Sequence, residues 1–465
     1  MVAMIPSPGM GHLIPMIELA KRVVGYEKLR VSFVIPSSGP PTKAQIMVLE
    51  ALPPSITHVF LPPVTLSDLP ADSKIETRIS HTVLRSLTSL RDTFHSLSAT
   101  HTLAAVVVDL FATDAFDVAR EFNASPYVFY PSTATVLSLF LHLRTLHRDL
   151  HCDFKDLPHP VNIPGCIPFH GKDILDPLQD RKDDAYAWVL HHANRYPEAQ
   201  GILVNTFPEL EPGPIKHLLT QEPPVYAVGP LVRMESISSS GSAECLAWLD
   251  QQPRGSVLFV SFGSAGTLSS AQINELALGL ESSQQRFLWV VKSPNDKLPN
   301  ASYFTADTHA DPFHFLPQGF VQRTKARALL LPSWAPQPQV LAHPSTAAFL
   351  THCGWNSVLE SIVNGVPLLS WPLFAEQKMN AFMLTHDVNV SLIPTSSSDD
   401  GLVHRHEIAT LVKSLMEGEE GKKLRYRIKD LKDAAAKALA DDGSSTNHIS
   451  TLALRWSNAP VTNLT

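Results

Sequence analysis

Cysteine is scarce in this chain, which contains four in 465 residues. None of them, Cys152, Cys166, Cys245 and Cys353, belongs to a C-x-x-C pair. Four cysteines do not make a disulfide framework in a chain of this length, and a reducing compartment is the usual setting for such a protein. We therefore predict a cytoplasmic location.

Long apolar runs and blocks of one charge are also missing. No stretch reaches about 18 consecutive apolar residues, so we predict no membrane-spanning segment and no stable membrane insertion. Residues 1–6 do not form a basic stretch followed by a long apolar run, which argues against a signal peptide. The formal net charge of -7 is spread along the chain without a Lys/Arg block. Nucleic acid is therefore not an expected partner.

Three catalytic motifs are absent. The chain has no G-x-S-x-G, which argues against an α/β-hydrolase. A G-x-G at residues 9–11 lacks its third glycine, since Ile14 stands there, and no acidic residue follows the second expected strand at 35–38. A nicotinamide-dependent oxidoreductase therefore fits poorly. There is also no D-x-D triplet that would hold a metal–diphosphate.

Metal-ligand spacings are not found either. His352-Cys353 are adjacent, which is not a zinc spacing. His191-His192 has no further partner at a useful spacing, and we interpret it as a solvent-facing pair on a helix. We predict no metal site and no bound cofactor.

Short apolar runs alternate with helix-period stretches in both halves of the chain, a pattern typical of parallel sheets covered by helices. The expected strands are 2–5, 31–35, 104–108, 127–130, 201–205, 256–262, 287–291, 328–331, 347–351 and 366–370. Expected helices include 13–24, 271–282, 356–363 and 421–440, and surface loops are expected at 293–313 and 396–401.

The length predicts two domains of roughly 200–250 residues each. Pro224, Gly229 and Pro230 close the first half, and the Ser/Gly-rich stretch 236–242 is typical of an exposed linker. We place an N-terminal domain at 1–230 and a linker at 231–250. A C-terminal domain at 251–430 and a helical segment at 431–465 follow.

A phosphate-binding turn is predicted after the strand 347–351. Its loop runs from His352 to Trp355, and a helix opens at Asn356 and Ser357 with Glu360 in its first turn. Such a turn with Gly354 collects free backbone N–H groups and the positive end of the helix dipole, and His352 adds a donor. An ordinary β–α turn with an N-cap explains the same residues equally well.

A second small-residue turn, Phe262–Thr267, lies between an expected strand and an expected helix. Small residues let the backbone approach a phosphate closely. Taken alone this signal is weak, because glycine-rich β–α turns are common.

A possible acid–base pair lies in the first half. His12 opens the first expected helix, and Asp109 follows the strand 104–108. In the usual order 3-2-1-4 the first and fourth strands are neighbours, so the two side chains should lie together. A carboxylate behind one ring nitrogen orients the imidazole as a general base. The alternative is a capping histidine and an unrelated aspartate.

Across its whole length the chain resembles the plant secondary-product glycosyltransferases of the UDP-glycosyltransferase superfamily. The segment from Trp334 to Gln377 is similar to the family's donor-binding box, with W-A-P-Q, H-P, F-L-T-H-C-G-W-N-S, E-S, G-V-P and A-E-Q at the family's spacing. One departure is Ala347-Ala348, where the family usually has two glycines, and we expect it to affect packing rather than binding.

The resemblance implies the GT-B fold, two facing Rossmann-like domains, the first binding the acceptor and the second the UDP-sugar. It implies that Trp334 stacks on uracil while the Ala335 backbone pairs with the base edge. It also implies contacts to the ribose, the diphosphate and the sugar: Gln337 and Glu360 on ribose; Ser264, His352, Gly354, Asn356 and Ser357 on the diphosphate; Trp355, Glu376 and Gln377 on the sugar. His12 and Asp109 match the family's catalytic dyad.

The reaction implied is an inverting transfer from UDP-glucose, without a metal, to the hydroxyl of a small lipophilic acceptor. Gln377 favours glucose over galactose in the family. The chain looks most like the hydroquinone and monolignol glucosyltransferases, which suggests a phenol, and Glu76 and Phe111 are expected to line its pocket. We expect a monomer. A UDP-sugar epimerase of the same architecture, or a UDP-sugar-binding protein without catalysis, remains an alternative.

Overall fold

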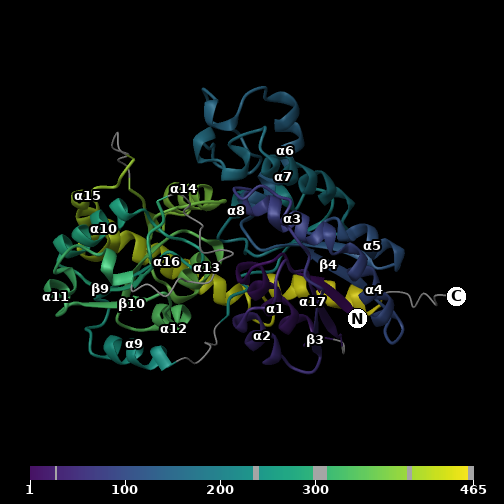
Figure 1. Ribbon diagram of the computed structural model, residues 1–465, viewed down its shortest axis with the longest axis horizontal. Coiled ribbons are helices and arrows are strands. Elements are labelled where there is room, and N and C mark those ends of the chain that lie inside the picture. The colour runs from purple at the N-terminus through teal and green to yellow at the C-terminus, as the bar shows by residue number, and fades with distance from the viewer. Residues whose placement is uncertain (27–28, 234–239, 297–311, 395–400, 459–465) are drawn as a thin grey trace. The chain divides into compact units, whose positions relative to one another are not determined.

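The computed structural model describes residues 1–26, 29–233, 240–296, 312–394 and 401–458 (Figure 1). The chain divides into two compact units: a first unit of Met1–Val232 with Ala435–Thr465, and a second unit of Arg233–Ala434. Helices and parallel strands alternate in each unit, which confirms the predicted α/β class with two parallel sheets.

The first unit is built on a seven-stranded parallel sheet of order β3-β2-β1-β4-β5-β6-β7. Its strands are β1 (Val2–Ile5), β2 (Val31–Ile35), β3 (Ile56–Phe60), β4 (Ala105–Asp109), β5 (Ser125–Tyr130), β6 (Ile202–Val204) and β7 (Val225–Ala227). Its helices are α1 (Met10–Val23), α2 (Lys43–Glu50), α3 (Ile75–Arg85), α4 (Leu87–Ser98), α5 (Ala115–Glu121), α6 (Ala134–Asp149), α7 (Asp184–Arg195), α8 (Pro212–Leu218) and α17 (Ser444–Ser457). Short 3-10 helices are η1 (Phe154–Asp156), η2 (Gly171–Asp173), η3 (Asp176–Leu178) and η4 (Tyr196–Glu198).

The second unit is built on a six-stranded parallel sheet of order β10-β9-β8-β11-β12-β13. Its strands are β8 (Val257–Ser261), β9 (Arg286–Val291), β10 (Ala328–Pro332), β11 (Thr346–Thr351), β12 (Leu368–Ser370) and β13 (Ser391–Leu392). Its helices are α9 (Ser240–Asp250), α10 (Ser270–Ser283), η6 (Pro312–Phe315), α11 (Phe320–Thr324), α12 (Gln337–Ala342), α13 (Trp355–Asn364), α14 (Gln377–His386), α15 (Arg405–Glu417) and most of α16 (Glu419–Ala438).

The central strands form around runs of mostly apolar residues that do not alternate with polar ones. Every residue of β1, β2, β4 and β8 is buried, as expected for strands covered on both faces of a parallel sheet. The ten expected strands are all present, shifted by at most two residues at an end. Three strands were not predicted, β3, β7 and β13, and all three are sheet edges. β3 alternates between buried and exposed residues, and β7 and β13 are only three and two residues long, so neither carries a long apolar run.

The two sheets have the same strand order over six strands, and this order predicts where each sheet binds a ligand. The order β10-β9-β8-β11-β12-β13 repeats β3-β2-β1-β4-β5-β6. At the centre of the first sheet Ile5 pairs with Val108, which confirms that the first and fourth strands are neighbours. In the second sheet Ser261 pairs with Thr351. In open α/β sheets, ligands bind beyond the carboxyl ends of such central strands.

The segments around the expected linker and C-terminus have structure of their own. Residues 234–239 of the linker lie outside the described residues, and α9 occupies Ser240–Asp250. Of the two loops expected at 293–313 and 396–401, the parts at 297–311 and 396–400 are likewise outside them. The last helix belongs to the first unit, where Ser445 Oγ donates to the Gly229 carbonyl at 2.5 Å and Trp456 contacts Tyr127.

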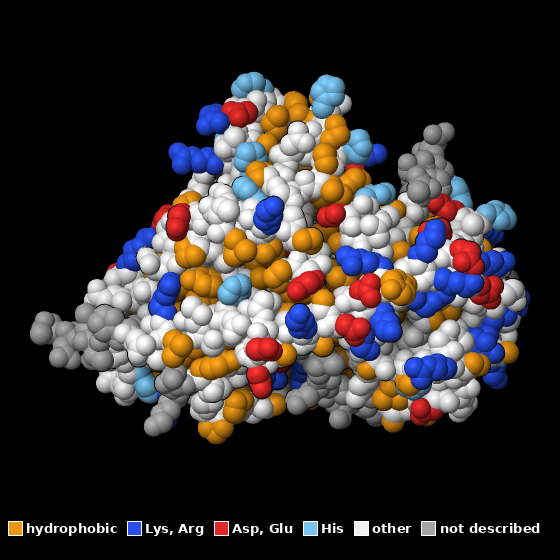
Figure 2. Space-filling model, turned by 180° about the vertical axis from the view of Figure 1, so that it is seen from behind, with side chains coloured by type: hydrophobic (Ala, Val, Ile, Leu, Met, Phe, Trp, Pro, Cys, Tyr) orange, Lys and Arg blue, Asp and Glu red, His pale blue; other side chains and the backbone are white. Residues whose placement is uncertain are grey.

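The surface of the described residues carries charges of both signs. On the face in Figure 2, Lys and Arg side chains lie among Asp and Glu side chains rather than in one basic patch. None of the helices described is both long enough and apolar enough to cross a membrane.

Candidate functional site

The first site is a histidine–carboxylate pair in the first unit. His12 lies in the first turn of α1, which begins after Gly9, and Asp109 is the last residue of β4. The His12 Nδ1 atom lies 3.2 Å from Asp109 Oδ2 and 3.0 Å from Oδ1. Asp109 is fully buried, whereas the His12 side chain is 18% exposed. The structure therefore brings together the two residues that the sequence predicted to meet.

This geometry sets the tautomer of His12. A carboxylate accepts hydrogen bonds but does not donate, so the proton of the neutral ring sits on Nδ1 and the lone pair on Nε2. A buried carboxylate also stabilises the imidazolium that forms when Nε2 takes up a proton. The pair can therefore act as a general base.

Of the two residues expected to line the acceptor pocket, Phe111 lies beside this pair and Glu76 is connected to it only through other residues. The Phe111 ring is 8% exposed and its centroid lies 6.5 Å from that of His12. Glu76, in the first turn of α3, is 5% exposed, and its backbone carbonyl accepts from Ser80 Oγ. Glu76 is linked to Phe111 through Ser80 and His192, whose ring contacts Phe111 at 5.7 Å.

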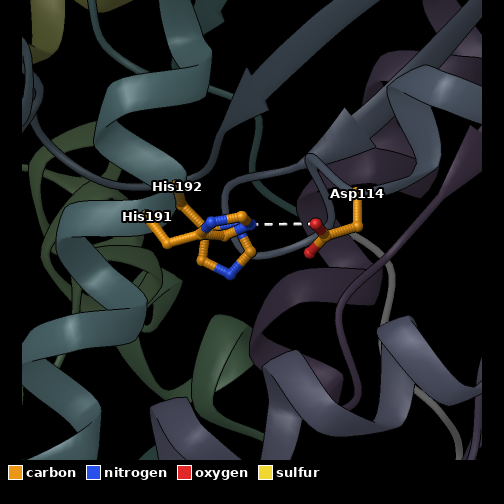
Figure 3. A group of neighbouring side chains, drawn as sticks. All are labelled: Asp114, His191 and His192. Atoms are coloured by element: carbon orange, nitrogen blue, oxygen red, sulfur yellow. Dashed lines mark hydrogen bonds and ion pairs between the residues drawn. The ribbon is translucent and has the colours of Figure 1, made fainter.

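The interpretation of His191-His192 as a solvent-facing pair is wrong for His192. Its side chain on α7 is fully buried, because neighbouring residues of a helix point about 100° apart and only His191 faces outward. Within the described residues, Asp114, His191 and His192 form a group whose ligand atoms lie within 4.8 Å of one another (Figure 3). The contacts that identify His192 as buried come from Ser80 of α3 and from Phe111 and Thr113 of the β4–α5 turn, far away in sequence.

The second site lies in the second unit, at the carboxyl ends of β8 and β11. The turn Phe262–Thr267 follows β8, and His352 follows β11. A Cβ atom on Gly263 would lie 2.5 Å from the His352 ring, and one on Gly354 would lie 2.4 Å from its Nε2. Gly263 also has φ +71°, which favours glycine. The two predicted phosphate turns therefore meet at one imidazole, held between two glycines.

His352 is uncharged at neutral pH. Burial lowers its pKa to about 4, and the Lys292 ammonium adds to this effect. Its Nδ1 is buried and finds no hydrogen-bond partner among the described residues. A buried polar atom without a partner is uncommon, and a ligand oxygen is one way to satisfy it. The N-terminus of α13, which begins at Trp355 directly after this loop, offers backbone N–H groups as well.

A hydrogen-bonded triad joins α12 to α13. Gln337 Nε2 donates to Glu360 Oε2 at 2.7 Å and lies 2.9 Å from Ser357 Oγ. Burial raises the pKa of the Glu360 carboxyl to about 7, an effect that the Gln337 amide opposes. The carboxylate has further lone pairs for vicinal hydroxyls. Gln337, Ser357 and Glu360, predicted to contact the donor, are thus brought together.

The remaining predicted donor residues differ in exposure. The Trp334 side chain, after β10, is 49% exposed, while Ala335 is 7% exposed. Such an exposed indole offers a flat face to a base. Asn356 is the second residue of α13 and follows Trp355, whose indole is buried. Ser264 is exposed on the turn after β8.

Glu376 and Gln377 lie at the start of α14, after β12. Gln377 Oε1 accepts from the backbone N–H groups of Leu373 and Phe374 at 2.9 and 3.1 Å, which leaves its amide group as the donor. Asn380 Nδ2 donates to the Cys353 carbonyl at 3.0 Å and lies 3.5 Å from Glu376 Oε1. Asn380 therefore ties this turn to the His352 loop.

Sequence reasoning did not single out Lys292. It follows β9, and its ammonium donates to the Ser264 carbonyl on the turn Phe262–Thr267. A lysine directly after an apolar strand is the same signal that identified Asp109 and His352. It was not recognised because it stands directly before the expected loop 293–313, which was interpreted as a surface insertion.

The amino-acid sequence of this chain is similar to those of known sugar-transferring enzymes. The model of the family described as UDP-glucoronosyl and UDP-glucosyl transferase matches residues 242–423, which span the second site. The hydroquinone glucosyltransferase of Rauvolfia serpentina is 60% identical over 460 residues, covering 98% of each chain.

Two solved structures are similar over the whole chain. A UDP-glucosyltransferase of Polygonum tinctorium capable of glucosylating indoxyl, in complex with 3,4-dichloroaniline, has a TM-score of 0.91 at 53% identity and covers 98% of each chain. UGT2 of Phytolacca americana, complexed with UDP-2-fluoro-glucose and pterostilbene, has a TM-score of 0.90 at 50% identity, covering 98% of this chain and 99% of its own.

Proposed function

Because this chain belongs to the plant UDP-glycosyltransferases, a family of GT-B enzymes, we propose that it transfers glucose from UDP-glucose to the hydroxyl of a small phenol, with inversion, to give a β-O-glucoside. It is a UDP-glucosyltransferase, and enzymes of this family take a UDP-sugar as co-substrate without a metal. What we propose beyond this is that the acceptor is a phenol, that the reaction inverts the anomeric configuration, and that individual residues have the roles given below.

The observation that carries the proposal is the contact between His12 and Asp109. The acceptor hydroxyl gives its proton to His12 Nε2, while the Nδ1–H group remains hydrogen-bonded to the Asp109 carboxylate. The acceptor oxygen forms a bond to the anomeric carbon as the bond from that carbon to the diphosphate oxygen breaks. Attack opposite the leaving group turns an α-linked donor into a β-glycoside, and the bonding electrons leave with UDP.

The donor is held by the second unit. Trp334 and Ala335 bind the base, Gln337 and Glu360 the ribose, and Trp355, Glu376 and Gln377 the sugar. The leaving charge is met by hydrogen-bond donors already in position: Ser264, His352, Gly354, Asn356, Ser357 and the N-terminus of α13. The neutral state of His352 supports this role, since an uncharged imidazole still donates one N–H without burying an unpaired cation.

A phenol is supported as the acceptor by the site and by the relatives. The aromatic ring of Phe111 beside His12 offers a flat apolar wall. The relative from Rauvolfia serpentina is named for hydroquinone, and UGT2 of Phytolacca americana binds pterostilbene. The alternatives of an epimerase and of a non-catalytic binder gain no support from these relatives. The monomeric state and cytoplasmic location stay predictions.

Incubation with UDP-glucose and a panel of phenols tests the proposal. We expect a phenol that gains one hexose by mass spectrometry, with a β-anomeric proton in its NMR spectrum. Conversion of UDP-glucose into another UDP-hexose without an acceptor would indicate an epimerase, and binding without any product would indicate a non-catalytic protein. An α-glucoside would contradict the inverting mechanism.

A further inference from the structure

Helix α7 and the residue after it hold the turn that follows Asp109. This turn, residues 110–114, connects β4 to α5. Tyr196, directly after α7, donates from its hydroxyl to the Leu110 carbonyl at 3.1 Å. One helical turn earlier, His192 contacts Thr113 and Phe111. The turn that begins with the proposed catalytic carboxylate is therefore anchored at both ends from one helix.

His192 is the centre of this anchor. Its ring is fully buried, with Nε2 2.9 Å from Ser80 Oγ on α3 and Nδ1 2.7 Å from Thr113 Oγ1. It also stacks on Trp188, with ring centroids 5.8 Å apart. One imidazole thus connects α3, α7 and the β4–α5 turn.

The hydrogen bonds fix which nitrogen carries the proton. Ser80 Oγ donates its single hydrogen to the Glu76 carbonyl at 2.8 Å, so it accepts from His192 Nε2–H. His192 Nδ1 then accepts from the Thr113 hydroxyl. Burial lowers the pKa of His192 to about 3, so the ring stays neutral and this arrangement persists across the working pH range.

The same contacts argue against a metal at Asp114, His191 and His192, although their ligand atoms are close (Figure 3). Both nitrogens of His192 already bond hydroxyl groups. The Asp114 carboxylate lies 2.9 Å from His191 Nε2 and 3.3 Å from an Arg195 nitrogen, whose positive charge opposes a cation. The group is a hydrogen-bond network that ties α7 to the turn.

We propose that His192 is a positioning residue for the transfer reaction: by bridging Ser80 and Thr113 it holds Phe111 and the Asp109 turn against His12. This inference rests on the proposed function, since it assigns no chemistry to His192 itself. If the Thr113 end of the bridge is lost, the turn relaxes, and both the carboxylate and the aromatic wall shift. A displacement of about 1 Å at a reacting group can lower the rate about 100-fold.

The two bonds of His192 can be removed separately. In His192→Asn the amide stands where Nδ1 stood and keeps the Thr113 bond, whereas in His192→Gln it reaches the place of Nε2 and keeps the Ser80 bond. Thr113→Val removes the hydroxyl at nearly constant volume. His147→Phe is a matched control, because His147 on α6 also hydrogen-bonds α7, at 2.8 Å, but through Tyr186, six residues before His192.

The readout is kcat and KM over phenols of differing acidity, with UDP affinity measured by calorimetry and folding by thermal unfolding. We expect Thr113→Val and His192→Gln to lower kcat about 10- to 100-fold on weakly acidic phenols and much less on phenols that are already ionised. His192→Asn should retain more activity than His192→Gln. UDP affinity should stay within twofold in every variant, and His147→Phe should behave as wild type.

Two outcomes would overturn the inference. Either Thr113→Val and His192→Gln keep wild-type kcat on weakly acidic phenols, or their losses are equal on acidic and weakly acidic phenols, which marks a general packing role. His12→Ala measured in parallel distinguishes failure of this inference from failure of the proposed function. If His12→Ala shows the acidity-dependent loss and the other variants do not, this inference alone fails. If His12→Ala does not show it, the proposed base fails and the inference fails with it.

Discussion

Gln337 donates a hydrogen bond of 2.7 Å to Glu360, a carboxyl group whose pKa burial raises to about 7. The amide belongs to α12 and the carboxyl to α13, so the contact joins the helix after β10 to the helix after β11. The proposed ribose site therefore contains a group that titrates at physiological pH.

This titration predicts pH-dependent donor binding. The carboxylate, but not the carboxylic acid, accepts from two ribose hydroxyls, so binding favours the ionised form and releases a proton. Below pH 7 Glu360 is protonated in the free enzyme, and affinity should fall about 10-fold from pH 8 to pH 6. UDP-glucose is the better ligand for calorimetry, because the terminal phosphate of UDP has its own pKa of about 6.

Glu360→Gln is the control for this effect. It should bind more weakly at pH 8 and show no dependence between pH 6 and 8. In the free enzyme His352 stays neutral across this window, because burial lowers its pKa to about 4. If donor affinity depended on pH equally in wild type and Glu360→Gln, Glu360 would not be a ribose contact.

Trp334 should be the base platform. Trp334→Ala should weaken UDP binding by about 1–3 kcal/mol, the usual loss when one base-stacking ring is removed. Tyr426→Ala is the matched control, since Tyr426 on α16 is also an exposed aromatic residue, at 74%. Calorimetric titration of UDP into both variants gives the result. Unchanged UDP affinity in Trp334→Ala would show that the indole does not contact the base.

The glycines around His352 should be needed for binding and not only for folding. Gly263→Ala places a methyl group 2.5 Å from the imidazole, and should cost about 1.5–3 kcal/mol of donor affinity if it displaces one hydrogen bond to a charged phosphate. Gly255→Ala is the control for backbone strain, because Gly255 has a similar φ of +62° and nothing within 4 Å of the added atom. Both variants should lose stability in thermal unfolding, but only Gly263→Ala should lose UDP affinity. Equal affinities would show that His352 does not contact the donor.

Turnover should not depend on a divalent cation. The proposed diphosphate contacts are hydrogen-bond donors, and Asp114 with the two histidines of α7 is occupied by its own bonds. Full activity after EDTA treatment and dialysis is expected. Strict loss of turnover that Mg²⁺ or Mn²⁺ restores would contradict the metal-free account.

Much of this arrangement could be predicted from local sequence patterns. The buried central strands contain continuous apolar runs, and the polar residues that end these runs, His352 and Asp109 among them, lie at the carboxyl edge of each sheet. The edge strands β3, β7 and β13 were missed because they are short or alternate with exposed residues.

Side-chain environments set by distant segments could not be predicted. His192 is buried by α3 and by the β4–α5 turn, which lie about 80 to 110 positions earlier in the chain. Lys292 meets Ser264 only because β8 and β9 pair in the sheet. The raised pKa of Glu360 depends on the packing around α13, which no local pattern encodes.

Asp109 should matter through His12. Asp109→Asn removes the charge that orients and stabilises the imidazolium but leaves the base in place, so it should lower kcat less than His12→Ala does. The double variant should be little worse than His12→Ala, because both residues serve one proton transfer. Additive losses in kcat would show that the two residues act independently, despite the 3.2 Å contact.

The central claim is that His12 is the base. A neutral phenol is a poor nucleophile, and general-base assistance is typically about 10²–10⁴-fold, so His12→Ala should lower kcat by about that factor. UDP affinity should stay near wild type, since the proposed donor residues belong to the other unit.

The decisive measurement is kcat of wild type and His12→Ala across phenols whose pKa values span the assay pH. A phenol already ionised at that pH needs no base, so the account predicts that the His12→Ala defect shrinks steadily as the acceptor pKa falls. A defect of the same size for acidic and weakly acidic phenols, or no defect on any acceptor, would contradict it.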